Sequence, residues 1–177
     1  MRSLVFTLVV GSFCLMAGCQ KVELKEFSPD GTFKVLMPEK KQQKDQDFGG
    51  LQGKTWIAEY NDGALYVAAA ILPEKKINAA LSDMMLKEGI KAMMTQTNAK
   101  LIKETEIKLD NEWPGREVEA SLKVPKKSGG GEVDGIVKIR AYIADGKMFI
   151  VQALGKPDWI AKPEIGQFLD SLHVIKK

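Results

Sequence analysis

Residues 133–154 read VDGIVKIRAYIADGKMFIVQAL and provide the starting point for the fold. Two apolar-rich runs, 133–144 and 147–154, flank the dipeptide Asp145-Gly146. An Asp-Gly pair favours a two-residue hairpin turn, because both residues tolerate a positive φ. The segment therefore predicts two paired antiparallel strands. We expect their core side chains to be Ile136, Ile139, Tyr142, Phe149 and Val151.

Further strand patterns lie on the N-terminal side of this hairpin. Residues 101–109 and 116–124 alternate polar and apolar side chains and are joined by a turn over residues 111–115. Residues 55–60 and 64–72 predict another hairpin around Asn61-Asp62-Gly63, and residues 32–37 predict a half-buried strand. Residues 39–53 and 126–132 are polar and glycine-rich, so we expect two long loops there.

Two segments have helical patterns. Residues 77–98 are rich in strong helix formers, but their apolar side chains divide between two nearly opposite faces, with the switch near Gly89. One face holds Ile77, Ala80, Leu81 and Met84, and the other holds Leu86, Ile90, Met93 and Thr97. Residues 157–172 end in a shorter helix with Ile165, Phe168, Leu169 and Leu172 at helical spacing. Residues 174–175 close as a short strand or a docked tail.

Strands, a long helix, more strands and a short helix predict an α+β fold, in which a largely antiparallel sheet is flanked by helices. The chain has 177 residues, of which 45% are hydrophobic and 28% charged, as is usual for one globular domain. The net charge is +3 and the basic residues are scattered, so we expect no nucleic-acid partner.

The N-terminus predicts export. Arg2 precedes an apolar run over residues 4–15, which is shorter than the ~20 residues of a membrane-spanning helix and fits a signal peptide. Residues 15–19 read LMAGC and resemble the lipobox of bacterial lipoproteins, although Met16 departs from the usual leucine. The resemblance implies cleavage before Cys19 and lipidation of its sulfur. Ordinary secretory cleavage after Ala17 is the weaker alternative, because a cysteine directly follows Ala17-Gly18.

We therefore divide the chain into a signal peptide over residues 1–18, a lipidated tether over residues 19–26 and one domain over residues 27–177. Cys14 leaves with the signal and Cys19 carries lipid, so no disulfide is expected in the mature domain. The lipid on Cys19 makes the membrane a partner and places the domain in the cell envelope, facing the periplasm or the exterior. Gln20 favours the outer membrane where sorting depends on the residue after the cysteine.

Four segments of the mature chain carry a family resemblance. They are FSPDGTFKVLMP at residues 27–38, PGRE at residues 114–117, RAYIADGKMFIV at residues 140–151 and FLDSL at residues 168–172. In their order and spacing, from Phe27 to His173, they resemble PsbP-like domains, above all the exported bacterial versions of uncharacterised function. The resemblance implies an α/β/α sandwich around a twisted, largely antiparallel sheet. It implies binding to partner proteins rather than a defined reaction.

Catalytic signatures are scarce. The chain has one histidine, His173, which excludes sites that need two, and it lacks the Gly-x-Ser-x-Gly motif of a nucleophile elbow. We expect no cofactor and no metal ion. Pairing of Asp134 or Glu59 with another carboxylate is one interpretation, but exposed strand charge is the simpler one. Arg116 and Arg140 lie on expected strands, where cross-strand ion pairs are the ordinary explanation.

Two functional hypotheses follow. The first is a membrane-anchored, non-catalytic binding domain that recruits or stabilises an envelope protein. The second is a small-ligand carrier or hydrolase that uses a pocket between sheet and helix. For partner binding we single out Phe48 and Leu51, which flank Gly49-Gly50 in the expected long loop, and then Trp113. Trp56 is expected in the core, whereas Trp113 and Trp159 are candidates for exposure.

Overall fold

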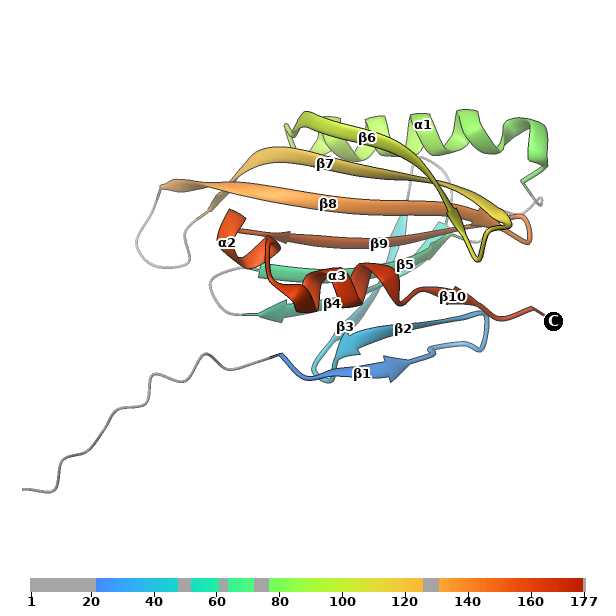
Figure 1. The fold of residues 1–177 in the computed structure, drawn as a ribbon, viewed down its shortest axis with the longest axis horizontal. Helices are drawn as coiled ribbons and strands as arrows, with labels where there is room; N and C mark the ends of the chain where they lie inside the picture. The colour runs from blue at the N-terminus through green and yellow to red at the C-terminus, as the bar shows by residue number, and fades with distance from the viewer. Residues whose placement is uncertain (1–21, 48–51, 61–63, 72–76, 126–130, 177) are drawn as a thin grey trace, which may run out of the picture.

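The structure is a computed structural model that describes residues 22–47, 52–60, 64–71, 77–125 and 131–176. Ten strands and three helices lie in the described part of the chain (Figure 1). The strands are β1 (Leu24–Phe27), β2 (Phe33–Pro38), β3 (Gln42–Asp47), β4 (Gln52–Tyr60), β5 (Ala64–Ile71), β6 (Lys100–Leu109), β7 (Trp113–Pro125), β8 (Glu132–Ala144), β9 (Lys147–Gly155) and β10 (His173–Val174). The helices are α1 (Ala79–Gln96), α2 (Pro157–Ile160) and α3 (Pro163–Asp170).

The main sheet has seven strands in the order β3-β4-β5-β9-β8-β7-β6, and every neighbouring pair is antiparallel. A smaller sheet has the order β1-β2-β10 and is also antiparallel. The expected hairpin of β8 and β9 is confirmed, with Ala144 opposite Lys147. Asp145 and Gly146 have φ of 46° and 74°, as a two-residue turn with positive φ at both positions requires.

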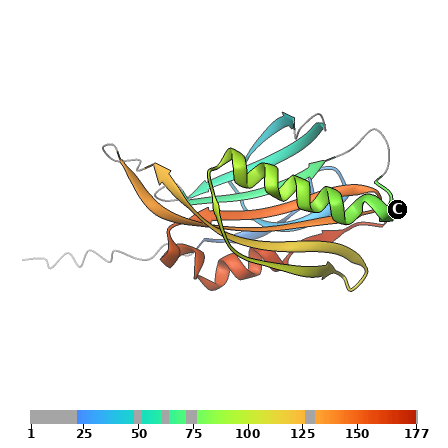
Figure 2. The same cartoon turned by 90° about the horizontal axis from the view of Figure 1, so that it is seen from above.

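A few helices pack against the main sheet (Figure 2). Alternate residues of β8 and β9 point to opposite faces, so each strand supplies two apolar clusters. One cluster packs Ile139 and Ile150 beneath Leu86 and Ile90 of α1. The other cluster packs the opposite face against α2, α3 and the small sheet, and includes Phe33, Tyr66, Phe149, Trp159 and Phe168.

Three expected boundaries differ from those of the structure. The long loop over residues 39–53 contains β3, which pairs with β4. β3 is an edge strand, and its sequence QQKDQD is polar at every position. It therefore lacks the alternation of polar and apolar residues that predicts a half-buried strand. The tether was drawn too long, because Leu24–Phe27 form β1 and pair with β2. The turn over residues 111–115 is also shorter, since β7 begins at Trp113.

The two-faced pattern of the long helix has a simple explanation. Leu86 and Ile90 are buried against the sheet, whereas Leu81 and Met84 on the other side are 44% and 55% exposed. Gly89 lies inside α1, and a Cβ there would be 3.7 Å from the Met148 side chain. The pattern therefore reflects one buried face and one exposed apolar patch.

Candidate functional site

An open groove lies between α1 and the edge strand β6. Asn78 caps the start of α1, where its side-chain oxygen accepts a hydrogen bond from the Leu81 N–H at 2.9 Å. The groove has a volume of about 580 Å³. Its lining residues are Lys87, Ile90, Lys91, Met94, Thr95, Asn98 and Ala99 from α1 and the turn after it, together with Leu101 and Glu104 from β6.

The groove is apolar at its base and cationic at its helical rim. Ile90 is buried and Met94 half-buried, and both pack into the cluster beneath α1. Lys87 and Lys91 are four residues apart on the helix, so their ammonium groups lie along the same side and are exposed. Leu101 forms the opposite wall and is 51% exposed. The groove therefore offers apolar contact beside positive charge.

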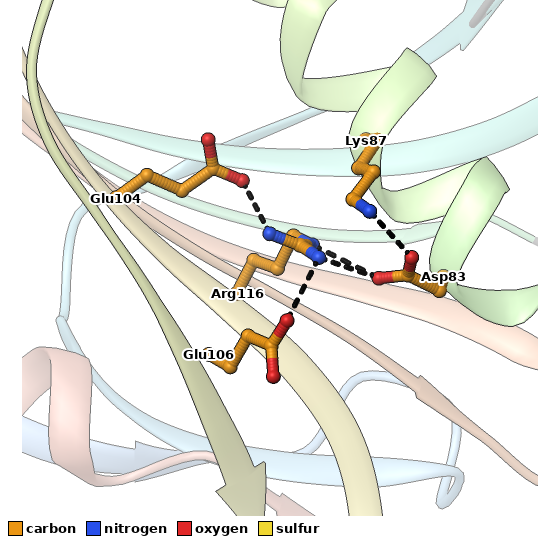
Figure 3. A network of polar contacts seen from close by, with 5 residues as sticks. All are labelled: Asp83, Lys87, Glu104, Glu106 and Arg116. Atoms are coloured by element: carbon orange, nitrogen blue, oxygen red, sulfur yellow. Dashed lines mark hydrogen bonds and ion pairs between the residues drawn. The ribbon is translucent and has the colours of Figure 1, made fainter.

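Arg116 stands at one end of this groove, at the centre of an ion-pair network (Figure 3). The guanidinium is 8% exposed and donates to Asp83 of α1 at 2.6 Å and to Glu104 of β6 at 2.6 Å. A third bond, at 3.2 Å, reaches Glu106, which is the residue opposite Arg116 in the β6–β7 ladder. Lys87 completes the network with a 2.7 Å contact to Asp83.

The network shifts two pKa values in opposite directions. Hydrogen bonds from Lys87 and then Arg116 lower the pKa of Asp83, because they stabilise its ionised form. The hydrogen bond to Asp83 raises the pKa of Arg116 and outweighs its partial burial. The guanidinium therefore stays charged and joins α1 to the edge of the sheet, which holds the groove walls together.

A second arginine, Arg140, links two strands to a helix through ion pairs. Arg140 of β8 donates to Glu117 of β7 and to Asp170 at the end of α3. Burial lowers the pKa of Arg140, but its hydrogen bonds to Asp170 and Glu117 more than offset this effect. The expected cross-strand pairs of both arginines are thus confirmed, as Arg116–Glu106 and Arg140–Glu117. In each network a helix supplies a further carboxylate that local sequence did not indicate.

Strongly exposed apolar side chains occur mainly on α1 and β6. The described residues include five large hydrophobic side chains that are strongly exposed, and four of them lie on these two elements. They are Leu81, Met84, Leu101 and Ile102; the fifth is Ile175 near the C-terminus. None of these four was selected from sequence as a binding residue. Two signals were available: the second apolar face of the long helix, with Leu81 and Met84, and the adjacent pair Leu101-Ile102, which interrupts the alternation of its strand.

The residues selected from sequence have mixed outcomes. Cys19, Phe48 and Leu51 lie outside the described residues. Trp113 is half-buried at the start of β7 and packs against the core, with Lys176 Nζ 5.8 Å from its ring centroid. Trp56 is buried as expected, at 3% exposure. The candidate exposure of Trp159 was wrong: it is 8% exposed and packs edge-on against Tyr66.

Metal ligands and membrane-spanning helices are two further features that bear on a functional site. His173 and Asp110 approach each other, with Nδ1 and Oδ1 3.3 Å apart. Across the described ranges, no group of three or more His, Cys, Asp or Glu side chains is arranged to hold a metal ion. No helix in those same ranges is both long and apolar enough to cross a bilayer.

Comparison with solved structures identifies the fold. The solution structure of cyanobacterial PsbP (CyanoP) from Synechocystis matches 93% of this chain and 99% of its own, with a TM-score of 0.51 and 15% sequence identity. This chain has a PsbP-like fold. A crystal structure from Bacteroides thetaiotaomicron matches 88% of this chain and 50% of its own, with a TM-score of 0.47 and 12% identity. No family model and no curated protein matches the sequence.

The PsbP-like fold agrees with the resemblance noted in the sequence at the level of a mostly antiparallel sheet with a few helices. At 15% identity, the likeness concerns the fold alone. The features of this chain that bear on its function are therefore the α1–β6 groove and the surface around it.

Proposed function

We propose that this chain is a membrane-anchored, non-catalytic binding domain of the bacterial cell envelope, and that its PsbP-like domain binds a protein partner through the α1–β6 surface. We define this surface by Leu81, Met84, Lys87, Leu101 and Ile102. The observation that carries the proposal is the exposure of four large apolar side chains on these two elements, of which Leu101 also lines the groove. Exposed apolar side chains beside a groove are typical of interaction sites.

The anchor is the other half of the proposal. The short apolar run and the LMAGC segment before Gln20 support cleavage and lipidation at Cys19. Two or more acyl chains on one cysteine hold a protein on a bilayer durably, whereas one chain binds only marginally. Gln20 supports the outer membrane as the destination. We also extend to this chain the α/β/α description of PsbP-like domains, with α1 on one face of the sheet and α2 and α3 on the other.

The groove itself supports a second candidate, a small-ligand carrier or hydrolase. Its volume of about 580 Å³ is within the usual range of small-molecule sites. One carboxylate, Glu104, is among its lining residues, and Arg116 already binds it at 2.6 Å. A hydrolase would need a second acid–base group at the same place, so we rank binding above catalysis.

Photo-crosslinking in envelope membranes tests the proposal. A crosslinking amino acid at Ile102 of the full-length protein should give a discrete protein adduct, because this exposed side chain would lie in the interface. Cys19→Ser should leave the protein soluble or its signal uncleaved, and should remove the adduct.

The matched control places the same crosslinker at Lys44 on β3, the opposite edge of the main sheet. Adducts of equal yield at both edges would show that the α1–β6 surface is not the binding face. A Cys19→Ser protein that remains mature and membrane-bound would contradict the lipid anchor.

A further inference from the structure

β6 ends the main sheet with one side of its backbone unpaired. It is the last strand in the order and pairs with β7 alone. Outside that ladder, one backbone hydrogen bond reaches β6 from the described residues, donated by Glu112 N–H to the Leu109 carbonyl at the hairpin turn. The outer N–H and C=O groups of a ten-residue strand are therefore free to pair with another strand.

The two edges of the sheet differ in their side chains. β3 carries the polar sequence QQKDQD. β6 carries Leu101 and Ile102, which are 51% and 54% exposed. The ladder with β7 shifts register between Leu101 and Lys103, so Ile102 is the additional residue of a β-bulge. A bulge re-aims side chains at an edge, and here two adjacent apolar side chains face solvent.

The charges along β6 are not balanced at its outer surface. Glu104 and Glu106 are engaged by Arg116 at 2.6 and 3.2 Å. Lys100 and Lys103 have no ion pair among the residues that the structure describes. The network sets two cations, Arg116 and Lys87, against three carboxylates and so keeps one negative charge. The three lysines of β6, Lys100, Lys103 and Lys108, outweigh it, so the net charge on this edge is positive. Electrostatic complementarity therefore selects an acidic partner.

We infer that β6 receives an extended acidic and apolar segment of a partner protein as an additional strand of the sheet. The inference rests on the proposed function and specifies how the α1–β6 surface binds. Main-chain hydrogen bonds to β6 would provide affinity, and alternate side chains of the added strand would provide specificity. Apolar side chains of the partner pack on Leu101 and Ile102, and its carboxylates face Lys100 and Lys103.

A second copy of this chain fits the edge poorly in the registers that centre on residues 104–106. Antiparallel pairing of two copies about a two-fold axis places residues symmetrically opposite one another. An axis at Glu104 or Glu106 sets a carboxylate against itself, and an axis at Thr105 sets Glu104 against Glu106. Like charges directly opposite each other destabilise a strand pair.

The position of β1 argues against a membrane as the ligand. Leu24 is the fifth residue after Cys19, a span of at most roughly 18 Å. Figure 1 shows β1 at the opposite end of the molecule from α1 and β6. A lipid on Cys19 would therefore hold the small sheet towards the bilayer and leave β6 directed away from it.

Titration of the ¹⁵N-labelled mature chain, residues 19–177 carrying Cys19→Ser, with eight-residue peptides tests the inference by NMR. The probes are capped peptides of alternating valine and glutamate, or of alternating valine and lysine. The acidic peptide should shift the backbone signals of β6 and leave those of β3 in place, and the basic peptide should do neither. Two further acidic peptides carry N-methyl groups, one at its odd-numbered and the other at its even-numbered residues. Alternate N–H groups face the same side of a strand, so only the peptide whose N-methyl groups face β6 should lose binding.

Charge reversal provides the matched variants. Lys103→Glu should weaken binding of the acidic peptide by about three- to tenfold, since one attractive pair becomes repulsive. Lys44→Glu makes the same change on β3 and should have no effect. Absence of β6 shifts at millimolar acidic peptide would overturn the inference. So would unchanged affinity of both N-methylated peptides, β6 shifts caused by phosphatidylglycerol vesicles instead, or a concentration-dependent dimer paired through β6.

The crosslinking and the titration fail separately. A protein adduct at Ile102 without peptide binding would leave the α1–β6 surface as a binding face and refute strand addition. Failure of both experiments would refute the proposed function as well.

Discussion

Gly115 and Trp113 show how single residues shape the start of β7. A Cβ at position 115 would lie 2.3 Å from Tyr142 Cδ1 and 2.8 Å from the Ala141 carbonyl oxygen, so only glycine allows β7 and β8 to approach here. Two residues earlier, the indole N–H of Trp113 is buried and has no hydrogen-bond partner in the described part of the chain. A buried donor without an acceptor costs about 1–3 kcal/mol. Trp113 therefore stabilises the fold through apolar contact, whereas its unpaired N–H destabilises it.

This difference predicts unlike results for the same substitution at two tryptophans. Trp113→Phe keeps an aromatic ring and removes the unpaired N–H, so we expect the free energy of unfolding to stay unchanged or to rise by up to about 1 kcal/mol. Trp56 Nε1 donates to Gln43 Oε1 at 3.2 Å, so Trp56→Phe should lower the free energy of unfolding by about 1–2 kcal/mol. Urea unfolding measures both. Equal losses would show that the Trp113 N–H does not destabilise the fold.

At the level of elements, two arginines fasten helices to the sheet. Arg116 joins β6, β7 and α1, and Arg140 joins β7, β8 and α3. The strand partners were predictable, because charged residues on expected neighbouring strands commonly pair. Asp83 was not, since it is 33 residues from Arg116 and only the docking of α1 on the sheet brings the two together.

The same reasoning explains which elements sequence analysis found. β8 and β9 were predicted because their turn and their apolar alternation are local signals. β3 was missed because an edge strand exposed to solvent has no apolar face to reveal its period. The groove was missed for a related reason: it requires both walls, and the relative position of α1 and β6 is decided by tertiary packing and the Arg116 network.

Asp83 makes the attachment of α1 dependent on pH. Its pKa lies below the ordinary value of an aspartate, so its contribution to stability is fully present above that ordinary value and is lost as the pH falls through the lower pKa of the folded protein. Asp83→Asn should lower the Tm at pH 7, and its difference from the wild type should begin to shrink below about pH 4 and disappear once Asp83 is protonated in the folded protein.

Thermal unfolding between pH 7 and pH 2 measures this difference. The control is Glu88→Gln, which removes another exposed carboxylate of α1 that has no ion pair within the described ranges. A difference between wild type and Asp83→Asn that stays constant across the whole range would contradict an electrostatic role for Asp83.

On the scale of the whole molecule, the small sheet decides where the folded domain begins. β1 pairs with β2 from Leu24↔Pro38 to Phe27↔Val35, and β2 also pairs with β10 at the C-terminal end of the chain. Phe27 packs edge-on against Trp56 with ring centroids 5.8 Å apart, and Leu24 packs against the same cluster. β1 is therefore part of the core that covers one face of the main sheet, although its four residues were too few to be recognised as a strand from sequence.

Truncation tests this boundary. A chain that begins at residue 28 lacks β1, and we expect its free energy of unfolding to be about 2–3 kcal/mol lower than that of a chain that begins at residue 22, because the half-buried Leu24 and Phe27 side chains are lost. The chain beginning at residue 22 should match the mature chain carrying Cys19→Ser, since it keeps every pair of the β1–β2 ladder. Urea unfolding of the three proteins provides the comparison.

If the chain beginning at residue 28 were as stable as the other two, β1 would be a peripheral strand and the folded domain would begin after Phe27. A loss confined to that chain places the boundary at β1. If Cys19 is lipidated as proposed, only four residues would then separate it from β1, which would keep the small sheet close to the lipid and leave the α1–β6 surface open to a partner.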